Sequence, residues 1–150
     1  MSFEIRRALP ADAQILYEMI VELADFEESI DQVDSSPSVL MSQIAEPSPP
    51  FECLIASANG VAIGFALFFY SYSTWRAKKG IWLEDLYVRE THRGQGVGSL
   101  LFDTVKAIAE AESAGRLEWA VLEWNTKAHE FYLAKGAQPL TEWRTWRVSL

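Results

Sequence analysis

A glycine-rich run with one arginine is the segment of this sequence whose residue types most directly indicate chemistry. It reads Arg93-Gly94-Gln95-Gly96-Val97-Gly98 and stands between a strand-like segment and an amphipathic, helix-like segment. Glycines in such a turn let backbone N–H groups approach an anion closely, and the start of the following helix adds favourable potential for a phosphate. The run therefore predicts a loop that binds a pyrophosphate group; the alternative is a tight turn that only begins the helix.

Two well-known nucleotide-binding loops do not fit this run. No Gly-Lys-Ser/Thr triplet follows it, which excludes a Walker A loop. A dinucleotide fingerprint that begins at Gly94 and Gly96 would require a third glycine where Ser99 stands. The run also lies far from the first strand–helix turn, where that fold carries its fingerprint. It belongs to neither class.

The charge balance indicates which ligands the chain attracts. Thirteen Lys+Arg against twenty-one Asp+Glu give a formal net charge of −8. Such a field repels the backbone of DNA or RNA, so we expect no nucleic-acid partner. It raises the local concentration of cations such as a polyamine, a lysine-like amine or a basic peptide, although an acidic surface that only maintains solubility is the alternative.

Length, cysteine usage and hydropathy restrict the class of protein. A chain of 150 residues with 49% apolar and 23% charged residues fits one globular domain over residues 1–150. The single cysteine, Cys53, excludes a disulfide framework, and His92 and His129 lack the spacing of metal ligands. No apolar run is long enough to cross a membrane, and the N-terminus has no signal-peptide layout. We therefore expect a cytoplasmic protein with no metal and no membrane partner.

The elements that must position the glycine run follow from hydrophobic periodicity, with Asn59-Gly60 as a hairpin turn. Helices are predicted from about residue 10 to 24, over 37–45, from the glycine run to about 115, and over 125–135. Strands are predicted at residues 3–6, 51–57, 61–72, 80–88, 117–122, 139–141 and 146–150. This order predicts an α+β fold of the α/β-sandwich type, with a mixed sheet of about seven strands and about four helices.

The glycine run resembles the acetyl-CoA pyrophosphate loop of the GNAT N-acetyltransferase superfamily, Gln/Arg-x-x-Gly-x-Gly/Ala, and the order of elements is similar to that fold, with its mostly antiparallel central sheet. Five further motifs resemble the diamine acetyltransferases, the group of spermidine/spermine N-acetyltransferase and thialysine N-acetyltransferase, and look closest to the thialysine branch. They are Tyr72-Ser73-Thr74-Trp75, Leu83-Glu84-Asp85-Leu86-Tyr87-Val88, Ala120-Val121-Leu122-Glu123-Trp124-Asn125, Phe131-Tyr132 and Gly136-Ala137-Gln138.

The resemblance implies acetyl-CoA as the co-substrate. The strand that ends at Val88 is expected to pair its backbone with the pantetheine arm, and one N–H there to polarise the thioester carbonyl. Asn125 is expected to cap the next helix and to touch the cofactor. The cofactor residues implied in this way are Leu86, Tyr87, Val88, Arg93, Gly94, Gln95, Gly96, Val97, Gly98, Ser99, Asn125 and Tyr132.

Two side chains are expected to be catalytic. Tyr132 resembles the general acid that protonates the departing CoA thiolate, which a phenol can do because its pKa lies near that of a thiol; a core tyrosine is the alternative. Glu84 is the candidate base, because an alkyl ammonium must lose a proton before it attacks. A regular strand would point Asp85 to the face opposite Glu84. The resemblance, however, implies a bulge here, where the strand splays to admit the cofactor.

The amine substrate is expected to contact Phe26, Glu27, Trp75, Glu84 and Asp85, with Trp75 stacking on a methylene chain or a cation. This sequence also departs from the polyamine enzymes of the group at two positions.

Ser73 stands where those enzymes carry an aspartate, and Arg144 stands near where they carry a glutamate. The loss of carboxylates favours an acceptor with fewer remote positive charges. The sequence therefore predicts a homodimeric acetyl-CoA-dependent N-acetyltransferase that acts by direct attack of a small primary amine, with thialysine favoured. Spermidine or spermine, an amino acid, an antibiotic or a protein lysine are alternative acceptors. A non-catalytic acyl-CoA sensor is the alternative of another class; the presence of both Glu84 and Tyr132 argues against it.

Overall fold

The computed structural model describes residues 2–150 and divides them into two compact units. The first unit ends at Trp119, and the second runs from Ala120 to Leu150. The single domain expected over residues 1–150 stays a prediction.

The first unit is built on one mixed sheet. Its strands lie in the spatial order β1 (Glu4–Arg7), β2 (Glu52–Ala58), β3 (Val61–Ser73), β4 (Lys78–Val88) and β5 (Leu117–Glu118). The first four strands pair antiparallel, and β5 runs parallel to β4. Asn59 and Gly60 make the tight turn between β2 and β3, as the sequence predicts.

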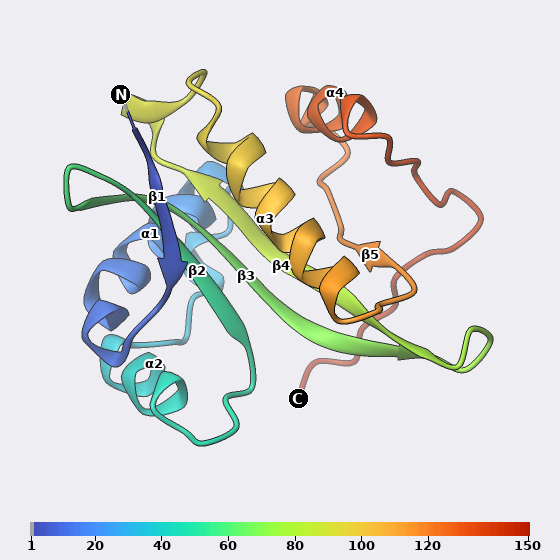
Figure 1. The fold of residues 1–150 in the computed structure, drawn as a ribbon, viewed down its shortest axis with the longest axis horizontal. Helices are drawn as coiled ribbons and strands as arrows, with labels where there is room; N and C mark the ends of the chain where they lie inside the picture. The colour runs from blue at the N-terminus through green and yellow to red at the C-terminus, as the bar shows by residue number, and fades with distance from the viewer. Residues whose placement is uncertain (1) are drawn as a thin grey trace. The chain divides into compact units, whose positions relative to one another are not determined.

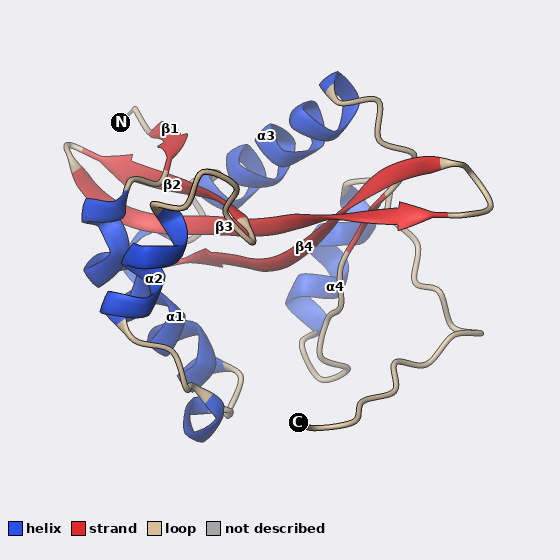
Figure 2. Cartoon of the chain, turned by 90° about the horizontal axis from the view of Figure 1, so that it is seen from below, coloured by secondary structure: helices blue, strands red, loops and turns tan. Residues whose placement is uncertain are grey.

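Helices cover both faces of this sheet (Figure 1 and Figure 2). α1 (Ala13–Phe26) and α2 (Pro37–Ile44) lie on one face, and α3 (Val97–Ala111) lies on the other. Three 3-10 turns, Pro10–Asp12, Ile30–Gln32 and Glu90–His92, join these elements. With α4 (Thr126–Ala134) of the second unit, the described residues contain four α-helices. The α+β class and the mixed, mostly antiparallel sheet are confirmed.

Two apolar helix stripes hold the sheet between them. On α1, Leu16 and Met19 are fully buried and pack in one cluster with Phe65 of β3. On α3, Leu101 and Val105 recur at helical spacing and are also fully buried. Each stripe removes large apolar side chains from water, at about 1.5–3 kcal/mol for each one fully buried.

The sheet has fewer strands than the seven expected. β5 has two residues where a strand over 117–122 is expected, and residues 139–141 and 146–150 form neither helix nor strand. A strand exists only where a ladder of backbone hydrogen bonds pairs it. The ladder between β4 and β5 ends at Trp82, just before β4 changes register, which explains the short β5. Near the C-terminus, apolar alternation alone has not produced a ladder among the described residues.

The helix of the second unit has the two ends that the sequence predicts. Asn125 caps its start, because Asn125 Oδ1 accepts a hydrogen bond from the Ala128 N–H at 3.2 Å. At its end Gly136 has φ 87°, and the Ala137 N–H donates to the Tyr132 carbonyl at 3.1 Å. This left-handed glycine with a closing backbone bond is a common helix terminus.

Gly64 lets β3 approach the last residues of β4. A Cβ at this position would lie 2.6 Å from the carbonyl oxygen of Tyr87 and 3.3 Å from Cα of Val88. Real Cβ atoms do not approach backbone oxygens so closely, so any side chain at Gly64 displaces the end of β4.

Replacing Gly64 with Ala is expected to lower the melting temperature by several degrees, at roughly 2–4 °C for each kcal/mol lost. The matched control is Gly98→Ala, because a Cβ there meets Val88 Cγ2 at an ordinary 3.6 Å and lies in a helix, where alanine is favoured. Thermal unfolding of the two variants checks this. Equal melting temperatures would contradict the close-approach argument.

Candidate active site

The glycine run forms an open loop between the turn Glu90–His92 and α3. Gly94 and Gly96 have φ 76° and 89°, a left-handed conformation that favours glycine, and nothing lies within 4 Å of the place where either Cβ would be. Gly96 is the N-cap residue of α3, so the N–H groups of the first turn have no acceptor one turn earlier in the helix. Open space beside N–H groups at the positive end of a helix fits a phosphate.

The structure places the predicted cofactor residues of this run on two adjoining pieces of backbone. The loop holds Arg93, Gly94, Gln95 and Gly96, and the first turn of α3 holds Val97, Gly98 and Ser99.

The end of β4 turns backbone groups of Leu86 and Val88 to the side away from β3. The Arg89 N–H donates to the Ile63 carbonyl at 2.8 Å, and Val88 lies opposite Gly64. Pairs in an antiparallel ladder alternate between hydrogen-bonded and non-hydrogen-bonded, so the pair next to Arg89–Ile63, Val88–Gly64, is non-hydrogen-bonded. The N–H and C=O of Val88 therefore point away from β3, and those of Leu86, two residues earlier, do the same. Within residues 2–119, β5 pairs with β4 only at Ile81 and Trp82. Leu86 and Val88 therefore form an edge that can accept an extended ligand arm as a strand.

Tyr87, between those two residues, is turned the other way. Its backbone faces Phe65 of β3, and its side chain packs in the core on the α1 side of the sheet. Of the three cofactor residues expected on this strand, Leu86 and Val88 thus turn their backbone N–H and C=O groups away from β3, whereas those of Tyr87 point toward Phe65 of β3.

A one-residue bulge at Glu84 sets the positions of both carboxylates on β4. Leu67 of β3 pairs with Asp85, and the next residue, Phe68, pairs with Leu83, so Glu84 has no partner opposite. The bulge that the family resemblance implies is confirmed. In a regular strand, Leu83 and Asp85 would lie on the same face of the sheet. Here they lie on opposite faces, because each shares the face of its β3 partner, and the adjacent residues Phe68 and Leu67 point to opposite faces.

The bulge turns Asp85 to the α1 side of the sheet. Cys53, Leu67 and Asp85 form one row across three strands, and the first two belong to the buried cluster under α1. Burial, then the charge of Asp85, raises the pKa of the Cys53 thiol, which is consistent with this placement. Asp85 is half-buried, whereas Glu84 is exposed and its Oε1 accepts a hydrogen bond from Trp82 Nε1 at 3.3 Å.

Three carboxylates act on one another here. Burial, and then the charges of Glu84 and Glu27, raise the pKa of Asp85 to about 7. Burial, and then the charge of Glu84, also raise the pKa of Glu27, which follows the last residue of α1. Crowded carboxylates of this kind favour a cation between them, because it relieves their mutual repulsion. We call Glu27, Glu84 and Asp85 the acidic cluster.

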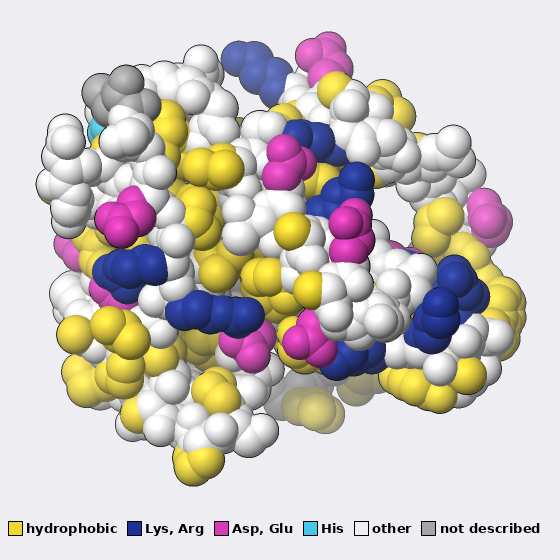
Figure 3. Space-filling model, in the orientation of Figure 1, with side chains coloured by type: hydrophobic (Ala, Val, Ile, Leu, Met, Phe, Trp, Pro, Cys, Tyr) yellow, Lys and Arg dark blue, Asp and Glu magenta, His cyan; other side chains and the backbone are white. Residues whose placement is uncertain are grey.

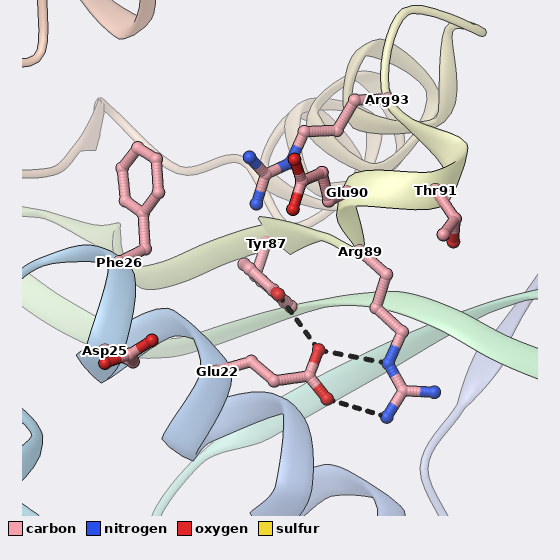
Figure 4. Close-up of a pocket in the computed structure, with 8 residues that line it drawn as sticks. All are labelled: Glu22, Asp25, Phe26, Tyr87, Arg89, Glu90, Thr91 and Arg93. Atoms are coloured by element: carbon pink, nitrogen blue, oxygen red, sulfur yellow. Dashed lines mark hydrogen bonds and ion pairs between the residues drawn. The ribbon is translucent and has the colours of Figure 1, made fainter.

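A cavity of about 420 Å³ lies between the end of α1 and the end of β4 (Figure 4). The Arg93 guanidinium lies 5.3 Å from the centre of the Phe26 ring and 5.6 Å from that of Tyr87, and Arg93 Nε donates to the Val88 carbonyl at 2.8 Å. The first residue of the glycine-rich loop is thus held against both α1 and β4 by cation–π contacts and a backbone bond.

The same cavity contains two residues that the sequence did not single out. Glu22 of α1 accepts hydrogen bonds from Tyr87 Oη at 2.9 Å and from Arg89 Nε and Nη2 at 3.1 and 2.9 Å (Figure 4). Burial, and then this bond to Glu22, raise the pKa of Tyr87 to about 12, so the phenol stays a donor. Glu22 and Arg89 are 67 residues apart, so no local spacing could have indicated the pair.

The structure does not bring Trp75 to the acidic cluster. Trp75 lies in the turn between β3 and β4 and is 85% exposed. Six residues of β4 separate Lys78 from Glu84, about 20 Å at the rise of a strand. Nearby, Ser73 Oγ accepts a hydrogen bond from Arg116 Nη2 at 2.9 Å. Contact of Trp75 with the substrate stays a prediction.

In the second unit, Asn125 and Tyr132 lie on α4. Asn125 is the N-cap residue described above, so its predicted capping role is confirmed. Tyr132 lies one turn from the end of α4, and its ring meets that of Phe131 edge to face, with centroids 5.1 Å apart and planes at 76°. The roles of both residues toward the cofactor stay predictions.

No group of three or more His, Cys, Asp or Glu side chains among the described residues is arranged to hold a metal ion. Within residues 2–150, no helix combines the length and apolar character that a membrane crossing requires. On the face that Figure 3 shows, Lys and Arg side chains stand among Asp and Glu side chains rather than in one basic patch.

Comparison with known proteins agrees with this geometry. The model of the acetyltransferase (GNAT) family matches residues 16–137. The chain belongs to the GNAT acetyltransferase family. The recognition expected from the phosphate loop and the later motifs is confirmed, and this GNAT protein is an acyltransferase that moves an acetyl group to an amine.

Individual relatives and a solved structure are similar to this chain over nearly its whole length. Thialysine N-epsilon-acetyltransferase of Bos taurus is 39% identical to this chain, and the aligned region covers 95% of this chain and 88% of that protein. Spermidine/spermine N(1)-acetyltransferase-like protein 1 of Homo sapiens is 28% identical over 97% of this chain, but only 22% of that protein is matched. A solved integron cassette protein from the mobile metagenome of V. cholerae has a TM-score of 0.81 at 23% identity, covering 99% of this chain and 93% of that one.

Replacing Asp85 with Asn is expected to stabilise the protein more at pH 8 than at pH 5. The folded pKa of about 7 lies above the ordinary 3.8, so the folded state holds the proton more tightly, and stability falls as pH rises between these values. The penalty is complete above pH 7 and is on the order of 4 kcal/mol, since each of the roughly three pKa units corresponds to about 1.4 kcal/mol. Melting temperatures of Asp85→Asn and the parent should therefore separate by several more degrees at pH 8. Asp34→Asn, at an exposed carboxylate, is the control. The same difference in melting temperature between Asp85→Asn and the parent at both pH values would contradict the burial of Asp85.

Proposed function

We propose that this protein transfers acetyl from acetyl-CoA directly to the side-chain amine of thialysine or a lysine-like amine, as a cytoplasmic homodimer. The observation that carries the proposal is the bulge at Glu84. It sets an edge for an acyl carrier, at Leu86 and Val88, a few residues from the acidic cluster that attracts an ammonium group.

The chain offers the groups that acetyl-CoA needs. Leu86 and Val88 would pair with the amides of the pantetheine arm, and a backbone N–H of this edge would donate to the thioester oxygen as negative charge develops there. The loop at Gly94 and Gly96, with the first turn of α3, would bind the pyrophosphate. When bound, acetyl-CoA supplies the activated acetyl group.

Proton transfer is assigned to two side chains, Glu84 and Tyr132, and substrate binding to two more. Glu84, exposed beside the half-buried Asp85, would accept a proton from the ammonium through water, which frees the amine lone pair. The amine nitrogen then forms a bond to the carbonyl carbon, and the C–S bond breaks. Tyr132 would give its proton to the departing thiolate, and Asp85 and Glu27 would hold the cationic substrate.

The preference for a lysine-like acceptor rests on the charges near Ser73. Polyamine enzymes of the resembled group carry an aspartate at this position, whereas here Ser73 is bonded to the Arg116 guanidinium. Without that carboxylate, a second, remote ammonium has one anionic partner fewer. The thialysine N-epsilon-acetyltransferases among the relatives support the same choice.

Release of CoA thiol from acetyl-CoA should be fastest with thialysine in a panel that also contains lysine, putrescine, spermidine and spermine. We expect kcat/KM for thialysine to exceed that for spermine by about tenfold or more, since one unfavourable charge contact is worth about 1–2 kcal/mol. Spermidine or spermine as the best acceptor would mean that the acidic cluster alone selects a polycation, and the assignment of a lysine-like substrate would be wrong.

Two conservative variants separate the acid from the base. Tyr132→Phe should lower kcat about 100-fold with little change in acetyl-CoA affinity, whereas Glu84→Gln should shift the rise of activity to higher pH, where more of the amine is neutral. Tyr72→Phe, at an exposed tyrosine of β3, is the control. Full activity of Tyr132→Phe would remove the acid role, and an unchanged pH profile of Glu84→Gln would place the base elsewhere.

A further inference from the structure

One carboxylate ties the middle of α1 to the end of β4. Glu22 accepts three hydrogen bonds, from Tyr87 Oη and from two nitrogens of Arg89, and Arg89 Nη1 also donates to the Ala62 carbonyl at 3.3 Å (Figure 4). A guanidinium that meets a carboxylate through two parallel bonds fixes its orientation as well as its distance. The Glu22–Arg89 pair therefore sets the angle of α1 over this end of the sheet.

Both ends of the pair are next to the groups proposed to bind substrate. Glu22 is five residues before Glu27, so it lies about 7.5 Å along the helix from the member of the acidic cluster that α1 supplies. Tyr87 and Arg89 flank Val88 of the cofactor edge. Any movement of α1 relative to β4 changes the distance from Glu27 to Glu84 and Asp85.

The position of the pair points to a role beyond stability. The Arg89 and Glu22 side chains are 25% and 37% exposed, so water weakens their attraction, although the two parallel bonds make the pair stronger than a simple surface ion pair. Comparable ion pairs, such as Arg7 with Glu52, lie away from the cavity. What distinguishes Glu22 and Arg89 is their place between the two binding surfaces.

We infer that Glu22 and Arg89 are positioning residues for the amine substrate, acting by holding α1 so that Glu27 completes the acidic cluster on β4. This inference rests on the proposed function. Arg93 provides a second tie through its contacts with Phe26 and Tyr87, but Arg93 belongs to the phosphate loop, so the test uses Glu22 and Arg89.

The decisive variant is Glu22→Gln with Arg89→Met, which removes the pair and leaves the net charge of the cavity unchanged. KM for thialysine should rise about tenfold while KM for acetyl-CoA stays within about twofold, because a small displacement of one binding group is costly only to the ligand that it contacts. The reversed pair, Glu22→Arg with Arg89→Glu, should restore the amine KM. Arg7→Met with Glu52→Gln is the control, since it removes a surface ion pair between β1 and β2.

An unchanged amine KM in Glu22→Gln/Arg89→Met would overturn the inference, as would an equal rise in both KM values or the same rise in the Arg7/Glu52 control. Hydrogen exchange provides a readout that does not need turnover. Amides of residues 22–28 should exchange faster in the variant, with acetyl-CoA binding unchanged. If the parent protein acetylates no amine in the panel, the proposed function fails; faster exchange at residues 22–28 would still support the positioning role, and unchanged exchange would refute it.

Discussion

A single extra residue in β4 determines how the functional groups of the first unit are arranged. With Glu84 unpaired, Asp85 turns to the α1 side of the sheet, while Leu83 stays with Phe68 on the side of α3. Without the bulge, Asp85 would follow Leu83 to that side, where Leu101 of α3 is fully buried. An ionised carboxylate there would lose its hydration without a partner, at a cost of several kcal/mol. The bulge avoids this cost and also ends the ladder with β5, which leaves the following edge of β4 open.

The sequence predicted the features that depend on neighbouring residues. The stripe of α1, the cap at Asn125, the end at Gly136 and the loop at Gly94 and Gly96 each depend on a few adjacent side chains or on one allowed φ value. The bulge is different, because nothing in residues 80–88 was interpreted as an interruption of the strand and only the family resemblance implied one. The Glu22–Arg89 pair joins two elements far apart in the sequence, so no periodicity contains it. The expected C-terminal strands show the same limit, since alternation does not specify a partner for the ladder.

Opposite charges are sorted along a short piece of backbone. Glu84 and Asp85 of the acidic cluster lie at the bulge, whereas Arg93 and the start of α3 provide positive potential farther along the chain. Arg89 also lies on that side, but Glu22 balances its charge. A strand that carries negative groups on one side and ends in an anion-binding loop suits a cationic acceptor and a polyanionic donor that meet between them.

An unpaired strand edge is also a hazard, because it offers a ladder to strands of other molecules and so promotes aggregation. In the first unit, the edge at Leu86 and Val88 is such a place. The bulge breaks the regular spacing that a foreign strand would need, and the bond from Arg93 Nε already uses the Val88 carbonyl. The Val88 carbonyl can still accept a second bond from a short ligand arm, because a carbonyl oxygen has two lone pairs, but a protein strand would also bury the Arg93 guanidinium beside its own backbone. The features that leave room for a ligand arm therefore also hinder self-association at this edge of β4.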